Sequence, residues 1–244
     1  MINLNNLKPE IRYLENMKEV VWDKKWMKTA PNLELYYMYR DIAENQVDWM
    51  KIIKNDLRYD ITILMPNKLG KEFNKTIGHD HPIVAGTNIT YPEIYEVKEG
   101  RAIFLLQDSE NETIKNVIAI KAKENDKIII PPNYEHLIIN IGKKPLKICN
   151  WICRRFTSNI YKPFRARKGF CYYALKGFFG IKWLKNENYQ SIPCLKFRKP
   201  NYFYNFNLSK DQPIYSLIID IKKLDFLKNP QNYEWSLDIT RDKN

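Results

Sequence analysis

Four side chains of this 244-residue sequence have the residue types and spacing of a metal site. His79 and His81 are two residues apart, and residues so placed on an extended strand point to the same face. Glu93 follows after a loop, and His136 lies further along the chain. Three neutral imidazoles and one carboxylate suit Fe, Mn, Ni, Zn or Co, and leave room for a water molecule or a substrate. The sequence therefore predicts a site for one divalent transition metal.

The alternative is that these histidines are core or surface residues without a metal. A lone His-x-His pair is weak evidence, because histidines occur in both settings. The order of motifs is more specific, since His-x-His is followed by Glu93-x-Tyr95 and then by Pro131-Pro132-x-x-x-His136. The chain has 3 histidines and all of them belong to this set, which favours the metal.

Short strands must hold these residues together. Runs rich in strand-forming residues are separated by turn signals. They predict strands at 33–39, 59–65, 94–97, 102–106, 117–120, 127–130, 137–140 and 146–152. Closely spaced short strands with few helices indicate an all-β sandwich or barrel. A barrel can fold a later strand back beside an earlier one, which would bring His136 to His79 and His81.

The flanking segments have weaker patterns. Residues 1–32 are expected to be an irregular or partly helical lead-in, and 214–227 a strand followed by a helical turn. A helix is expected at 41–57, with an apolar face formed by Ile42, Val47, Met50 and Ile53. The predicted division is a lead-in with strand and helix at 1–58, a barrel core at 59–155 and a C-terminal extension at 156–244. The extension is either part of the same domain or an appendage.

Composition limits the expected partners. The formal net charge is +12, which fits a nucleic-acid partner, a solvated lysine-rich surface or the attraction of an anionic substrate. Because the lysines are dispersed and no nucleic-acid motif is recognisable, no nucleic acid is expected. Residues 169–184 mix aromatics with lysines, which suits a membrane surface, but such segments more often pack on a barrel or a subunit partner. No membrane partner is expected.

The compartment is predicted from what the sequence lacks. The first residues contain no basic stretch followed by an apolar one, and no run of about 18 apolar residues occurs. The 4 cysteines fit no zinc-binding pattern, and a disulfide framework is not expected without a secretory signal. The prediction is a cytoplasmic protein with reduced thiols.

Several motifs, in order, resemble one family. They are Tyr36–Asp41 (YYMYRD), Tyr59–Thr62 (YDIT), Gly70–Phe73 (GKEF), Lys75–Pro82 (KTIGHDHP), Tyr91–Val97 (YPEIYEV), Pro131–His136 (PPNYEH) and Ile139–Gly142 (INIG). This set resembles the cupin-type glucose-6-phosphate isomerases, metal-dependent enzymes of archaea and some bacteria, over about residues 30–175. The resemblance implies an all-β cupin barrel, also called a double-stranded β-helix or jelly roll, with N- and C-terminal additions. It also implies a homodimer.

The resemblance also implies an activity and a set of site residues. The reaction would interconvert glucose 6-phosphate and fructose 6-phosphate by moving a hydrogen between C1 and C2. Glu93 would be both a metal ligand and the candidate base of an enediol route, with Tyr95 beside the sugar, and a hydride shift is the alternative. The phosphate donors would be Tyr36, Thr62, Thr76 and the backbone N–H of Gly78. From residue type alone, Tyr36 and Thr62 also fit ordinary strand positions.

The chain departs from the compact archaeal members of the family in one half of the pocket. The loop between His81 and Glu93 is longer, and the chain resembles a second branch in this respect. Ile152 and Ser158 stand near the positions where compact members have a phosphate-contacting tyrosine and a histidine. Tyr161 is expected to substitute for these donors.

Two other functions fit the same residues. A cupin dioxygenase also uses three histidines and a glutamate for its metal, but the phosphate-binding candidates Thr62 and Thr76 argue against it. A non-catalytic sugar-phosphate-binding cupin is the second alternative, and the presence of both Glu93 and Tyr95 argues against it.

Overall fold

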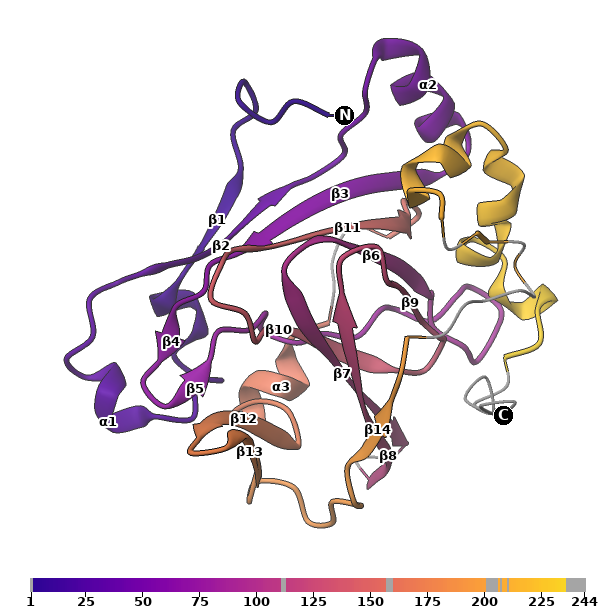
Figure 1. Cartoon of the computed structure of the whole chain (residues 1–244). Coiled ribbons are helices and arrows are strands. Elements are labelled where there is room, and N and C mark those ends of the chain that lie inside the picture. Colours follow the sequence, from indigo (N-terminus) through magenta and orange to yellow (C-terminus); the bar gives the residue numbers. More distant parts are fainter. Residues whose placement is uncertain are drawn as a thin grey trace.

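The computed structural model describes residues 2–110, 113–156, 160–200, 206, 208–209 and 211–235, and its strands form three sheets in which most neighbours are antiparallel (Figure 1). One sheet has six strands in the order β1-β2-β3-β11-β6-β9. Their bounds are β1 Glu10–Tyr13, β2 Glu34–Tyr39, β3 Leu57–Leu64, β11 Leu146–Cys153, β6 Glu93–Glu99 and β9 Lys127–Ile130. Strands far apart in sequence are neighbours here, as β3 and β11 are.

A second sheet faces the first and has the order β10-β7-β8-β14. Its strands are β10 Glu135–Asn140, β7 Arg101–Glu110, β8 Thr113–Lys123 and β14 Lys196–Arg198. The segment before the His-x-His pair extends this sheet, because Lys75 bridges to Ile139 and His79 bridges to His136. The two sheets form the expected all-β jelly-roll barrel of the cupin type. The predicted strands of the core all occur, and that at Lys127–Ile130 has the predicted bounds.

A small third sheet packs against the outside of the barrel in the order β13-β12-β5-β4. Its strands are β13 Gly180–Lys185, β12 Tyr172–Gly177, β5 Glu72–Phe73 and β4 Lys68–Leu69. The aromatic segment 169–184 is thus a hairpin, whose Tyr172 and Ala174 are buried in a cluster with Leu105 and Leu137 of the barrel. Among the described residues, no helix is long and apolar enough to cross a membrane.

Apolar side chains fill the space between the two large sheets. Val97, Phe104, Ile138 and Ile148 belong to one buried cluster, to which both sheets contribute. Burying such side chains stabilises each by about 1.5–3 kcal/mol relative to exposure, so this cluster holds the two sheets together.

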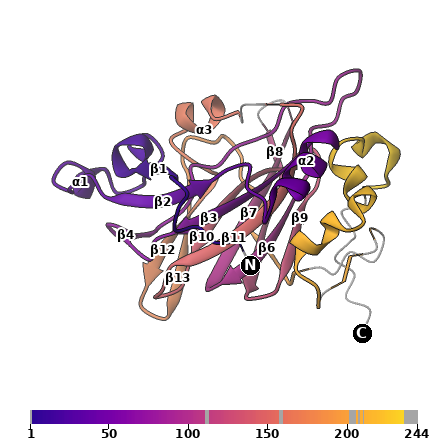
Figure 2. The ribbon, with the colours of Figure 1, turned by 90° about the horizontal axis from the view of Figure 1, so that it is seen from above.

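Short helices cover the outer face of the six-stranded sheet. They are α2 (Gln46–Lys54) and three 3-10 helices at Ile214–Ile218, Ile221–Leu227 and Pro230–Asn232. Both views of the ribbon place the C-terminal helices on the side of the barrel opposite α1 (Lys24–Met27) (Figures 1 and 2). Trp151 of β11 joins the two layers, because its Nε1–H donates to the Ile214 carbonyl over 2.7 Å. Two further helices of the described chain are a 3-10 helix at Leu14–Met17 and α3 at Lys162–Ala166.

The predicted helix at 41–57 is too long and has the wrong apolar face. The Asn45 side chain caps the observed helix by accepting from Asp48 N–H over 2.8 Å. Asp41 and Asp56 have φ values of 57° and 55°, which a right-handed helix does not allow. Val47 and Met50 of the predicted face are 75% and 60% exposed, whereas Ile52 is the buried residue of this helix.

The chain ends differ from the predictions in two respects. The lead-in at 1–32 is partly helical, as expected, but it also contains a strand, β1, which pairs with β2. The segment 214–227 forms two 3-10 helices in place of a strand, and buries Ile214, Ile218, Ile221 and Leu224. These residues are three or four positions apart, so they share one face of a helix and would not share one face of a strand. The division at 58 and 155 stays a prediction.

Candidate metal centre

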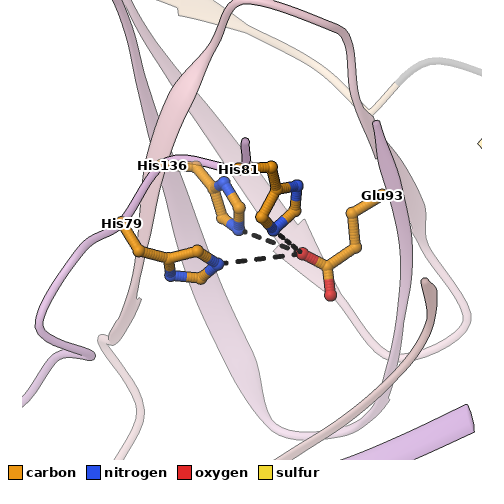
Figure 3. Close-up of side chains that lie close together, drawn as sticks. All are labelled: His79, His81, Glu93 and His136. Carbon is orange, nitrogen blue, oxygen red and sulfur yellow. Dashed lines mark ion pairs between the residues drawn. The ribbon is translucent and has the colours of Figure 1, made fainter. Parts of the chain in front are cut away.

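The side chains of His79, His81, Glu93 and His136 converge on one point, as the sequence predicts (Figure 3). One ligand atom from each of them lies within 4.8 Å of all the others. Glu93 Oε2 is 3.3 Å from His81 Nε2, 3.4 Å from His136 Nε2 and 4.0 Å from His79 Nε2. Glu93 is the first residue of β6, and His136 is the second of β10. The site therefore joins the two facing sheets.

Backbone hydrogen bonds explain why the histidines meet. His79 and His136 exchange two N–H···O bonds of 3.0 Å, so their side chains start from directly opposite positions on neighbouring segments of the same sheet. His79 to His81 do not form a regular strand, contrary to the prediction, because only isolated bridges occur at His79 and Asp80. Gly78, with φ of +87°, interrupts the extended chain just before them, and a Cβ there would lie 2.9 Å from the Phe170 ring.

The contacts of the His81 ring fix its tautomer. Its Nδ1 lies 2.8 Å from the Tyr91 carbonyl oxygen, which can only accept a hydrogen bond. Nδ1 must therefore carry the proton, and Nε2, which faces Glu93, has a free lone pair. Metal-binding histidines are commonly oriented in this way by an acceptor on the other ring nitrogen.

A metal ion would give a partner to two buried polar atoms of the cluster. His81 Nε2 and Glu93 Oε2 make no hydrogen bond within the described chain. Leaving buried polar atoms unsatisfied costs about 1–3 kcal/mol each. Metal bonds of about 2.1 Å place ligand atoms about 3.0 Å apart at right angles and about 4.2 Å apart on opposite sides. The separations of 3.3–4.0 Å around Glu93 Oε2 lie within this range.

The charge state of the cluster is also that of a metal site. Burial lowers the pKa of His79 well below its ordinary value, and burial likewise lowers the pKa of His136. Burial alone would raise the pKa of Glu93, but His136 and His81 outweigh it and hold the pKa of this carboxyl well below its usual range. Neutral imidazoles and an ionised carboxylate are the forms that bind a cation.

A pocket of about 550 Å³, open to solvent at its mouth, lies beside the cluster. The predicted substrate-site residues Tyr36, Thr62, Thr76, Tyr95 and Tyr161 all line it. The Tyr95 hydroxyl is 3.2 Å from His136 Nε2 and therefore lies next to the metal ligands. Residues of the metal cluster and several hydroxyl groups therefore line the same pocket.

Tyr36 and Thr76 are both able to donate a hydrogen bond into the pocket. Burial raises the pKa of Tyr36 to about 12, so its phenol stays neutral. Thr76 Oγ1 accepts from Ile138 N–H over 3.0 Å, so its own O–H remains free to donate. Gly78 lies between two lining residues, and its N–H makes no hydrogen bond to the described part of the chain. The roles of these groups toward a substrate stay predictions.

Four further polar residues line the pocket and have no role predicted from the sequence: Arg40, Arg58, Asp60 and Asn150. Asn150 Nδ2 donates to Glu93 Oε1 over 2.6 Å and so orients the carboxylate. Positions 58, 60 and 62 alternate along β3, so the choice of Thr62 as a pocket residue also points to the other two. Ile152 lines the pocket as well and offers no polar group, and Ser158 lies outside the described residues.

The chain is similar in sequence to curated glucose-6-phosphate isomerases. The curated glucose-6-phosphate isomerase of Thermococcus litoralis is 30% identical over 145 residues, which are 58% of this chain and 68% of that protein. The glucose-6-phosphate isomerase of Pyrococcus furiosus is 28% identical over 142 residues, with the same two shares.

Solved structures with a related arrangement include oxalate oxidase in complex with glycolate. It has 16% sequence identity, a TM-score of 0.39, and coverage of 56% of this chain and 58% of that one. Oxalate decarboxylase of Lactobacillus farciminis has 17% identity and a TM-score of 0.41, over 65% of this chain and 34% of that one.

The family model described as "Glucose-6-phosphate isomerase (GPI)" matches residues 12–191. This range is more than half of the chain, and it contains all four residues of the metal cluster and every residue of the pocket lining. The chain therefore belongs to the glucose-6-phosphate isomerase family, in its cupin-type branch.

Proposed function

We propose that this protein is a metal-dependent isomerase that interconverts glucose 6-phosphate and fructose 6-phosphate. The observation that carries the proposal is the position of Glu93. Its carboxylate belongs to the metal cluster and also lines the pocket beside Tyr95. The membership of the chain in this family supports the same substrate.

The reaction moves one hydrogen between C1 and C2 of the open-chain sugar. A base takes the proton from C2 of the aldose, and the same proton or one from solvent is added at C1 of the enediol. The hydroxyl proton passes from O2 to O1, so the product is an isomer of the substrate. A divalent ion in this cluster would supply Lewis-acid stabilisation of the negative charge that develops on the sugar oxygen.

The residues of the chain have distinct parts in this scheme. Glu93 is the candidate base, and Asn150 holds one of its carboxylate oxygens while the other faces the histidines. The pKa of Tyr95 is raised well above its usual value by burial and then by Glu93, so its hydroxyl is a neutral donor beside the sugar. Tyr36, Thr62, Thr76, Tyr161 and the N–H of Gly78 are proposed as donors to the phosphate.

The test is an assay of the purified protein after metal removal. Fructose 6-phosphate conversion should be absent without metal, and should return when Fe, Mn, Ni, Zn or Co is added back singly. Absence of conversion with every one of these metals would refute the proposed activity. Running the active form in deuterated water separates the two routes, because the enediol route brings solvent deuterium into the product and a hydride shift does not.

The assembly and compartment are proposed from the resemblance. A homodimer is expected, and light scattering of the purified protein tests it. A cytoplasmic location is also proposed, since all four cysteines are free and three of them are buried thiols.

A further inference from the structure

The proposed phosphate donors have one common property, which is that none of them carries a charge. Tyr36, Thr62, Thr76 and Tyr161 offer hydroxyl groups, and Gly78 offers a backbone N–H. A sugar phosphate carries close to two negative charges at neutral pH. Binding it in a partly enclosed pocket requires a cation, because a charge moved out of water without a partner is costly.

The pocket contains a charged cluster that the proposed reaction does not use. Arg40, which directly follows β2, and Arg58 of β3 both line it, and buried Asp60 contacts both of them. Arg58 makes the closer contacts, with Nε 3.0 Å from each oxygen of Asp60 and Nη2 2.9 Å from Oδ2. Arg40 Nη1 is 3.5 Å from Asp60 Oδ2. One buried carboxylate thus faces two guanidinium groups, and the only other carboxylate paired with them in the described chain, Glu10, lies at the exposed rim.

Of the two arginines, Arg40 has the weaker hydrogen-bond partners. Its Nη2 points to the thioether sulfur of Met38 at 3.2 Å, and a thioether is a weak acceptor. Its Nε donates to Glu10 over 3.2 Å at the rim, where the Glu10 side chain is 54% exposed. An exposed ion pair of this kind contributes little. A phosphate oxygen is a much stronger acceptor than either partner.

The register of the sheet places Arg40 among the proposed phosphate donors. Tyr36 and Met38 precede it on the same face of β2, and Met38 is paired with Thr62 of β3. The contact with Met38 bends the Arg40 side chain back toward this pair. Arg40 lines the same pocket as Tyr36 and Tyr161.

We propose that Arg40 binds the phosphate group of the substrate as its counter-charge, and that Asp60 positions the Arg40 guanidinium. Arg58 is a positioning residue, because it neutralises and orients Asp60. This inference rests on the proposed sugar-phosphate substrate. It also explains how the pocket can bind a phosphate although Ile152 offers no hydrogen-bond donor, since a guanidinium supplies two N–H groups and a charge.

The decisive variant is Arg40→Gln, assayed as the metal-loaded full chain. It should fold, because Arg58 still pairs with Asp60 and no buried charge is left alone. The KM for fructose 6-phosphate and the inhibition constant of inorganic phosphate should each rise about tenfold or more, which corresponds to the loss of one charge-assisted contact. The kcat should change much less. Arg40→Lys keeps a charge without the planar fork, and should restore part of the phosphate affinity.

Arg155→Gln is the matched control. Arg155 forms an ion pair of 3.1 Å with Asp56 and does not line the pocket, so this variant should leave both constants unchanged. An unchanged phosphate inhibition constant in Arg40→Gln would overturn the inference. So would equal impairment of Arg40→Gln and Arg40→Lys, because packing and not charge would then be responsible.

A binding measurement separates this inference from the proposed activity. Glucose 6-phosphate should raise the melting temperature of the wild-type metal-loaded protein, and should raise that of Arg40→Gln much less. If the wild type binds in this Arg40-dependent way but converts no sugar, the proposed activity fails and the phosphate site stands. If both proteins are stabilised equally, the phosphate site fails whatever the activity.

Discussion

Each carboxylate oxygen of Glu93 has different neighbours. Oε2 faces three imidazoles and Oε1 accepts from Asn150, so the orientation of the carboxylate does not depend on solvent. The side chain is 3% exposed. Under the proposed function, replacing this residue disturbs both metal binding and chemistry.

We therefore expect Glu93→Ala to lose metal affinity and activity together, with kcat/KM lower by about a hundredfold or more. Metal content after dialysis and turnover of fructose 6-phosphate measure the two effects. Glu99→Ala is the control, because Glu99 is at the end of the same strand and its side chain is 67% exposed. Normal turnover by Glu93→Ala would show that Glu93 is not the base.

A second prediction concerns the hydroxyl group of Tyr161. It lines the pocket, and its ring is 5.9 Å from that of His79. Tyr161→Phe removes one neutral hydrogen bond to the phosphate and should raise the KM for fructose 6-phosphate about three- to tenfold. Tyr37→Phe is a suitable control, because the Tyr37 hydroxyl bonds to Glu34 outside the pocket. An unchanged KM in Tyr161→Phe would remove this residue from the site.

The six-stranded sheet is the element that arranges the pocket wall. Its register aligns Asp60 with Asn150 and Asn150 with Tyr95 across three adjacent strands. Neighbouring strands are about 4.8 Å apart, so one row of inward-facing side chains spans the distance from the arginines to the metal cluster. A slip of one residue would turn this whole row to the opposite face.

A stability prediction tests the corrected face of α2. Ile52→Ala should lower the free energy of unfolding by about 2–5 kcal/mol, because Ile52 is 1% exposed in a packed cluster. Met50→Ala, at a position that is 60% exposed, should change it by no more than about 0.5 kcal/mol. Urea unfolding of both variants measures the difference. A larger effect at Met50 would restore the face predicted from sequence.

Some of these structural features could be predicted from the sequence alone and others could not. The core strands were predictable because short β-branched runs lie between clear turns. The metal ligands were predictable because the chain has few histidines and all of them fall in two motifs. The inward face of α2 could not be predicted, because apolar residues occur on both of its faces. The position of Arg40 in the pocket could not be predicted either, since the sequence does not distinguish a surface arginine from a pocket arginine until the sheet register is known.

At the scale of the whole molecule, the metal cluster connects distant parts of the chain. Its residues come from the His-x-His segment, from β6 and from β10, so a bound ion would link both facing sheets. A ligand that binds only the folded state stabilises it by mass action.

Removal of metal by a chelator should therefore lower the melting temperature, by about 5 °C or more for a chain of this size. Calorimetry before chelation, after it and after metal is restored measures the effect. In His136→Asn the chelator should have little effect. An identical melting temperature with and without metal would argue against a bound ion at this cluster.

The metal-free protein should also lose stability in mild acid. Burial lowers the pKa of His79 and of His136, whereas in the unfolded chain these groups titrate near 6.5. Below about pH 6.5 the unfolded chain binds protons that the folded chain does not, so the free energy of unfolding decreases as the pH falls. Urea unfolding of the metal-free protein between about pH 8 and pH 5 measures this. Constant stability over that range would contradict the buried neutral imidazoles.

The loop between His81 and Glu93 is held by its own hydrogen bonds. Val84 N–H donates to the Ile89 carbonyl over 2.8 Å, and the Thr90 hydroxyl accepts from Asn133 N–H over 2.7 Å. Its tip at Ala85 is exposed, and a Cβ on Gly86 would meet nothing within 4 Å. The tip can therefore be altered without moving the ligands at either end. A thiol introduced at position 85, with exposed Cys194 replaced by serine, would let the protein be immobilised or dye-labelled while its pocket stays open.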